Sequence, residues 1–217
     1  FPSTFFSACD TVPRMLCGDS VRYRLATNEV LSNVVAVPLS DNLPTSDCQS
    51  FLVTVDDTSQ LLTLSWSLNP DPDIMGYYLC SGFPCTDFDT VWGPLSHTYT
   101  CTSLSPLETH TFRLLAFDSC SQAGPLTETV GNMVLHIAVD TAIRQLTATW
   151  TPYIGMPGGV SRQALLVRYG SSSWDTIGLD HSQVYYSFTV SDRHALSLFT
   201  KVMAFGSDGL VSSSNIV

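Results

Sequence analysis

Positive charge is scarce in this sequence. Its 217 residues include nine Lys and Arg against 19 Asp and Glu, which gives a formal net charge of −10 at pH 7. Lys201 is the only lysine. Proteins bind the nucleic-acid backbone and anionic membrane surfaces through clustered Lys and Arg side chains. We therefore expect neither nucleic acid nor an anionic membrane surface among the partners.

Several motifs are missing as well. No apolar run approaches the roughly 20 residues that cross a bilayer as a helix, so we expect no membrane insertion. The histidines have no H-x-H or H-E-x-x-H spacing, and the cysteines form no C-x2-C knuckle. A G-x-S-x-G nucleophile elbow is also absent. These absences exclude the common zinc and serine-hydrolase motifs, and we expect no metal and no cofactor.

Apolar residues and cysteines, in contrast, are plentiful. Hydrophobic residues make up 44% of the chain and charged residues 13%, a balance that favours a folded protein with a sizeable core. Seven cysteines is a high count for this length. Because their spacing does not suit zinc, we interpret them mainly as disulfides, which persist in oxidising compartments. The sequence therefore predicts an extracellular or cell-surface protein.

The chain contains an internal repeat. The stretch LLTLSW at 61–66 is echoed by QLTATW at 145–150, and FRLLAFDS at 112–119 is matched by TKVMAFGS at 200–207. The repeat spans about 85 to 90 residues of short alternating strands separated by turn residues, which is the size and texture of a β-sandwich. The sequence thus predicts an all-β fold. The expected core landmarks are Trp66, Trp150, Leu114, Ala116, Val202 and Ala204.

The repeated residues resemble a fibronectin type III domain. Trp66 ends the second strand, a tyrosine follows in the third, and the corner LSPLETHTF leads into FRLLAFD. The corner of that family typically reads L-x-P-G-T-x-Y, and here His110 stands where the tyrosine would be. Its ring could still donate the corner hydrogen bond. The resemblance implies tandem immunoglobulin-like (fibronectin type III) β-sandwiches.

The resemblance also implies a division of the chain. The two fibronectin type III-like domains are expected at 45–131 and 132–217, with an interdomain joint at 41–44 (DNLP). Residues 1–44 are similar to the last two strands of such a module. We expect a strand pair there, which is either the remnant of a preceding module or a segment that docks on the next one. A lone strand pair cannot bury its own apolar face.

A narrower resemblance covers residues 45–217. YYLCSGFPC, MVLHIAV and ATWTPYIGMPGG look like the tandem fibronectin-like modules of Bacteroidetes exported surface proteins. Such proteins often end in a gliding-motility-associated C-terminal domain that directs type 9 secretion, and this sequence lacks that sorting domain. The resemblance implies that the chain is part of a longer exported protein.

The sandwich interpretation suggests how the cysteines pair. Cys120 lies in the loop before the last strand of the first sandwich, at the pole where the chain enters that module near Cys48. We therefore expect a Cys48–Cys120 disulfide. The other expected pairs are Cys80–Cys85, which flanks the tight turn SGFP, and Cys9–Cys17, with Cys101 left as a free thiol in the core.

Three polar clusters have alternative interpretations. Asp118, Ser119 and Cys120 could form a nucleophile with an orienting acid, but sequence neighbours on a strand diverge, and KVMAFGSD builds the same strand without them. The NPDPD stretch, with Asn69, Asp71 and Asp73, could help bind calcium, although a solvated turn is favoured. Asp87, Asp89 and Trp92 could form a sugar-stacking platform, although an aromatic packed on its own sheet is favoured.

These observations together predict a protein that is not an enzyme. We expect a non-catalytic module of an exported cell-surface protein, a spacer, adhesion or protein-interaction segment whose partners are other protein domains or surface glycans. The alternative is an accessory or carbohydrate-binding portion of a secreted hydrolase whose catalytic domain lies elsewhere. The fold does not select between them, since sandwich domains have many unrelated roles.

Overall fold

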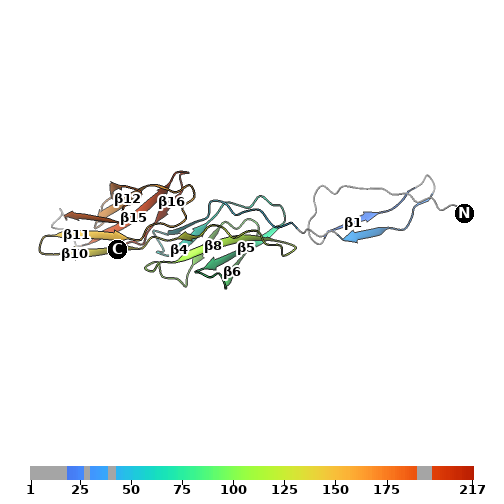
Figure 1. Ribbon diagram of the computed structural model, residues 1–217, viewed down its shortest axis with the longest axis horizontal. Coiled ribbons are helices and arrows are strands. Elements are labelled where there is room, and N and C mark those ends of the chain that lie inside the picture. Colours follow the sequence, from blue (N-terminus) through green and yellow to red (C-terminus); the bar gives the residue numbers. More distant parts are fainter. Residues whose placement is uncertain (1–18, 27–29, 39–42, 190–196) are drawn as a thin grey trace.

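A computed structural model describes residues 19–26, 30–38, 43–189 and 197–217, and these residues form strands, turns and irregular segments. Three parts follow one another along the long axis: a hairpin (β1–β2), module one (β3–β9) and module two (β10–β16) (Figure 1). The predicted all-β fold is confirmed. Within the described ranges, no helix could span a bilayer.

The hairpin pairs β1 (Ser20–Tyr23) with β2 (Val35–Pro38) in antiparallel register, Ser20 opposite Pro38. Of its strand residues only Val21 is even partly buried. The strand pair expected within residues 1–44 is thus present, with its apolar side chains largely exposed.

Module one is a sandwich of two antiparallel sheets. The strand order is β3-β4-β7 in one sheet and β6-β5-β8-β9 in the other. Alternation of polarity explains the layers: Leu62 and Leu64 of β4 are buried, whereas Thr63 and Ser65 are half-buried. The strands are β3 (Leu52–Val55), β4 (Leu62–Ser65), β5 (Ile74–Ser81), β6 (Phe88–Trp92), β7 (Thr98–Cys101), β8 (Thr111–Asp118) and β9 (Val130–Gly131).

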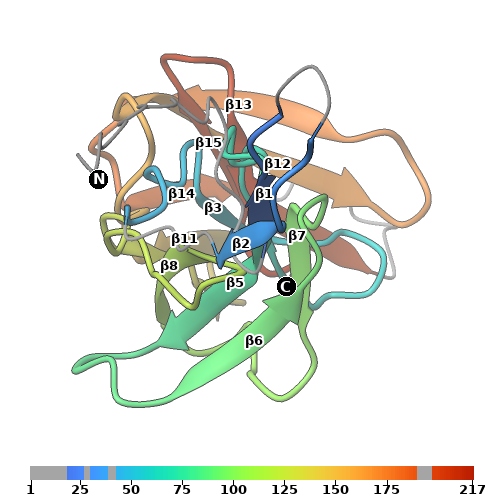
Figure 2. The ribbon, with the colours of Figure 1, turned by 90° about the vertical axis from the view of Figure 1, so that its right-hand side faces the viewer.

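Module two repeats this topology strand for strand. Its sheets have the orders β10-β11-β14 and β13-β12-β15-β16. Viewed along the long axis, β5 and β6 of module one and β12 and β13 of module two lie on opposite sides (Figure 2). The strands are β10 (Leu135–Asp140), β11 (Gln145–Trp150), β12 (Val160–Tyr169), β13 (Asp175–Leu179), β14 (Tyr185–Thr189), β15 (Leu198–Gly206) and β16 (Val211–Ser213).

Each sandwich has its own apolar core, and all six landmark residues lie in these cores. Trp66, Leu114 and Ala116 are buried in module one; Trp150, Val202 and Ala204 are buried in module two. The two tryptophans occupy equivalent positions with different neighbours. Trp66 packs against the Tyr77 ring, 5.1 Å between centroids, whereas the Trp150 Nε1 donates a hydrogen bond of 2.8 Å to Gln163.

Candidate functional sites at the module joint

The two modules share an extensive joint, built where β3 of module one lies beside β16 of module two. The Ser212 hydroxyl donates to the Val53 carbonyl (2.8 Å), and the Ser213 amide donates to the Thr54 hydroxyl (2.9 Å). Leu52 points the other way from Val53 and belongs to the apolar core of module two. Module one therefore contributes a side chain to the core of its neighbour.

The tip of the β3–β4 hairpin extends this contact. Lys201 of β15, with a side chain only 5% exposed, pairs with Asp57 at 2.5 Å. The Ile216 amide donates to the Gln60 side chain (2.9 Å). The only lysine of the chain is thus buried at the joint, where its charge is met by a carboxylate from the other module.

The loop 151–159 of module two provides the second half of the joint. The Tyr153 hydroxyl accepts the Val53 amide at 3.0 Å, and burial raises the pKa of this tyrosine. Ile154 and Gly131 exchange backbone hydrogen bonds. Gly155 has φ +70°, and a Cβ there would lie 2.0 Å from the Thr129 carbonyl, so only glycine allows this approach. Contacts with β16 and with the loop 151–159 together hold β3 against module two.

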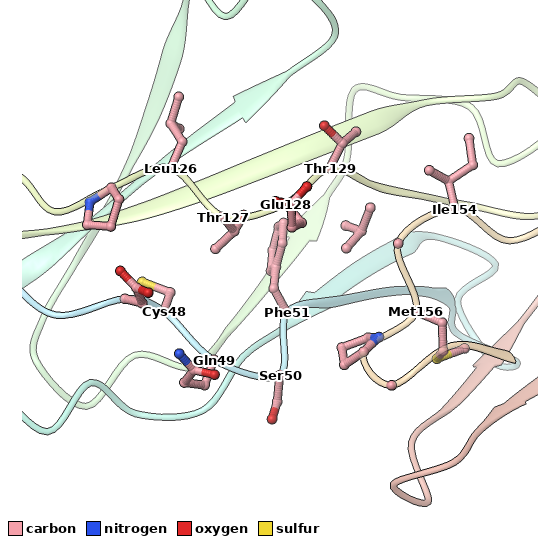
Figure 3. A pocket seen from close by; sticks show the side chains of 16 residues that line it. Cys48, Gln49, Ser50, Phe51, Leu126, Thr127, Glu128, Thr129, Ile154 and Met156 are labelled. Atoms are coloured by element: carbon pink, nitrogen blue, oxygen red, sulfur yellow. The ribbon is translucent and has the colours of Figure 1, made fainter.

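A groove of about 750 Å³ opens on module one beside this joint (Figure 3). Three segments line it: 47–51 before β3, 125–130 before and into β9, and 154–158 of module two. Phe51, Val130, Ile154 and Met156 give it an apolar lining. The charged residues in the lining are Asp47 and Glu128, both acidic.

The cysteine predictions have mixed outcomes. Cys80 and Cys85 form a disulfide, and Cys101 is a buried free thiol. The predicted Cys48–Cys120 disulfide is wrong: Cys48 is also a buried free thiol, whereas Cys120 is disulfide-bonded. Cys48 turns into the core of module one, while Cys120 is held in a surface turn. Cys9 and Cys17 lie outside the described residues.

Asp118 maintains that turn. The residue is 3% exposed, and its carboxylate accepts hydrogen bonds from the amides of Cys120 (2.8 Å) and Gln122 (2.7 Å). The Ser119 amide donates to the Asp73 carbonyl. The geometry of Asp118, Ser119 and Cys120 is that of a folded-back strand end rather than a nucleophile held by a base.

The NPDPD loop fastens the start of module one. Asp71 accepts the Ser46 amide (2.6 Å) and hydroxyl (3.0 Å), and the Asn69 side chain donates to the Ser46 carbonyl (2.8 Å). The Asp71 carboxylate and the Asn69 side chain thus have protein partners. In the part of the chain that the structure describes, no three His, Cys, Asp or Glu residues form a cluster that could hold a metal.

Trp92 and Asp89 do not form one platform. Their side chains project from opposite faces of β6, because they are three positions apart on the strand. Asp89 accepts a hydrogen bond from the Tyr99 hydroxyl at 3.2 Å. Trp92 packs edge-on against Phe117, 5.3 Å between centroids, and remains 65% exposed. Asp87 precedes the strand and is exposed. The indole is therefore an aromatic packed on its own sheet with one open face.

The two buried thiols predict a loss of stability in base. Burial raises the pKa of Cys48 and of Cys101 from 9.0 to about 11. A raised pKa means that folding favours the protonated thiol, so this contribution is complete below pH 9 and is lost as the pH rises toward 11. We expect module one to unfold at lower urea concentration at pH 10.5 than at pH 8, and Cys48→Ser/Cys101→Ala to flatten this dependence. An unchanged slope in the double variant would contradict the assignment.

No family model and no curated protein matches this chain. Among solved structures it is similar to the chicken CNTN1 FN1–FN3 domains, at 13% identity and TM-score 0.34, covering 90% of this chain and 75% of that one. It is also similar to a two-domain fibronectin type III segment of chicken tenascin, at 14% identity and TM-score 0.32, covering 79% of this chain and 97% of that one.

The strand order decides the fold. Each module pairs a three-stranded sheet with a four-stranded sheet in which the third, sixth and seventh strands are neighbours. Both modules have the fibronectin type III fold. Within the first fibronectin module, the His110 Nε2 lies 2.9 Å from the Ser105 carbonyl, so the ring makes the corner hydrogen bond usually made by tyrosine.

Sequence reasoning did not find the joint, although its residues carry a signal. Lys201 and Ser212 are almost completely buried, which is unusual for polar residues. Ser214 and Asn215 bond within module two, whereas Lys201, Ser212 and Ser213 mark the surface that faces module one. Their partners in β3 and its turn lie about 150 residues away, and no local pattern connects them.

Proposed function

We propose that this chain is a non-catalytic segment of an exported cell-surface protein, in which two fibronectin modules act as a rigid spacer that presents interaction surfaces. The observation that carries this proposal is the joint, because Leu52, Lys201 and Tyr153 connect the modules through apolar, ionic and hydrogen-bonded contacts. Interfaces between domains of one chain are usually polar and allow relative motion, whereas this joint also places an apolar side chain of one module in the core of the other. A spacer needs such a fixed geometry, and catalysis does not.

Export is supported by the disulfide and by sequence resemblance. The Cys80–Cys85 bond suits an oxidising compartment. The similarity to Bacteroidetes exported surface proteins supports a surface location through type 9 secretion. Other protein domains are the partners that this proposal favours.

Carbohydrate binding, as in the accessory part of a secreted hydrolase, is the second candidate. The open indole face of Trp92 favours it, since sugars stack on exposed aromatic rings. Asp89 faces the other side of the strand, however, so the ring lacks the neighbouring carboxylate that would orient a sugar hydroxyl. We place this candidate below the rigid spacer.

The rigidity of the joint gives a direct test. In residual dipolar coupling measurements, one alignment tensor should fit both modules of the wild-type chain. Asp57→Lys places a second cation beside buried Lys201, so the joint should open and the two modules should require separate tensors. Asp19→Lys makes the same change at an exposed acid directly before β1, in the hairpin at the end of module one farther from module two (Figure 1), and should keep the single tensor. Separate tensors in the wild type would contradict the proposed spacer.

A further inference from the structure

The β3–β4 hairpin has a counterpart in the β10–β11 hairpin of module two. In the first tip the Asp56 carboxylate accepts the Ser59 amide at 2.8 Å, and in the second the Asp140 carboxylate accepts the Ala142 amide at 2.9 Å. Each tip ends on a residue with φ 54°, Gln60 in one and Arg144 in the other. The two hairpins therefore have the same tip design.

Among the described residues, contacts with the other module are made by the first of these tips and not by the second. The β3–β4 tip lies against module two through Asp57 and Gln60. On the β10–β11 hairpin, Val139 is 60% exposed and Ile143 is 62% exposed. An apolar tip of this kind is complementary to an apolar groove.

The surface that receives the first tip is also repeated. In module two the tip contacts Lys201 on β15 and the Ile216 amide, and the strand leading to the tip contacts the edge residues Ser212 and Ser213. In module one, Arg113 takes the place of Lys201 in the matched stretches FRLLAFDS and TKVMAFGS, and the edge is the segment 125–130. In module two β3 covers this edge. In module one Gly124, which corresponds to Ser212, packs against Thr45, and only the following segment 125–130 lines the open groove (Figure 3).

The free tip and the open groove are complementary in charge as well as in polarity. Asp47 and Glu128 are the charged residues of the groove lining, and Arg144 stands at the tip. The apolar side chain of Ile143 would meet the apolar lining that includes Phe51 and Ile154.

We propose that the groove of module one is a docking site for the β10–β11 tip of a second copy of this chain. The contact uses the same kind of hairpin tip and the same module edge as the joint, with Arg144 and the groove carboxylates in place of the Asp57–Lys201 pair, so copies associate head to tail. Such an interface is heterologous, because the tip of one copy binds the groove of the next. Further copies can then add to form an open filament, or a ring if the last copy meets the first. This goes beyond the rigid spacer, which requires no self-association.

Sedimentation velocity of the full chain, from low micromolar to about 1 mM, tests the proposal. We expect concentration-dependent oligomers in the wild type. Ile143→Asp in the tip and Glu128→Arg in the groove should each weaken association at least tenfold. Leu107→Asp, which adds the same charge at another exposed apolar site, should leave association unchanged. Circular dichroism and thermal unfolding verify that every variant is folded.

Mixing the two defective variants sharpens the test. Ile143→Asp retains an intact groove and Glu128→Arg retains an intact tip, so an equimolar mixture should form heterodimers and nothing larger. In the swap Arg144→Glu/Glu128→Arg, association should recover relative to either single change. A wild-type chain that remains monomeric to about 1 mM, or variants that associate as the wild type does, would overturn the proposal.

Discussion

Replacing Leu52 by alanine should destabilise module two, although Leu52 belongs to a strand of module one. The side chain is 5% exposed and lies in the core of module two with Met133 and Trp150. Removing a buried leucine leaves a cavity that typically costs about 2 to 5 kcal/mol. Hydrogen exchange with mass spectrometry, followed peptide by peptide, should show faster exchange in β10–β12 and β15.

The neighbouring residue supplies a matched control. Val53 is fully buried in the core of module one, and it uses only its backbone groups at the joint. Val53→Ala should therefore raise exchange in β4, β5 and β8 while module two keeps most of its protection. If both variants loosened the same module, the division of β3 between two cores would be wrong.

The fold could be predicted from the sequence because its determinants are local. LLTLSW and QLTATW alternate in polarity, and repetition of FRLLAFDS as TKVMAFGS showed that the same unit was built twice. The Cys80–Cys85 disulfide was predictable for the same reason, since the two cysteines are only five positions apart across a turn.

The joint and the Cys48 environment could not be predicted, because both depend on the direction of side chains brought together from distant segments. Placing Cys48 and Cys120 at the same pole of module one did not determine which way either side chain points. Cys48 points inward, and its thiol contributes to the core with Phe51 and Val53. Period-2 alternation predicts one buried face for a strand such as β3, and it gives no reason for both Val53 and Leu52, on opposite faces, to be buried.

The two modules bury equivalent tryptophans in different ways. Tyr77 lies opposite Ala116 and Gln163 lies opposite Ala204, so the tyrosine ring of module one is replaced by an amide in module two. In the described part of the chain the Trp66 Nε1 finds no acceptor, and the indole is instead packed between Phe51 and Tyr77. Module two depends on a polar network at the position where module one depends on aromatic packing.

Gln163→Leu should therefore cost module two about 2 to 5 kcal/mol of unfolding free energy, because several buried polar groups lose partners at once. The Gln163 amide accepts the Trp150 Nε1 at 2.8 Å and donates to the carbonyls of His181 (2.6 Å) and Gln183 (3.2 Å). Leucine fills a similar volume and satisfies none of them. Urea unfolding followed by hydrogen exchange of β12 measures the loss. The control is Gln183→Leu. The Gln183 side chain donates one hydrogen bond, at the exposed surface, to the Tyr185 carbonyl, so its loss should change the unfolding free energy by less than about 0.5 kcal/mol.

Gln163→Glu separates hydrogen bonding from packing, because the two side chains have nearly the same shape. A carboxylate can accept from Trp150, but it can donate to the two carbonyls only when protonated. Burial and these acceptors should raise the pKa of the introduced glutamate, so the variant keeps its stability at pH values below the usual pKa of about 4.3 and loses it as the pH rises through the raised value. A variant equally stable at pH 4 and pH 8 would show that the amide donors are dispensable, and that packing alone holds Trp150 in place.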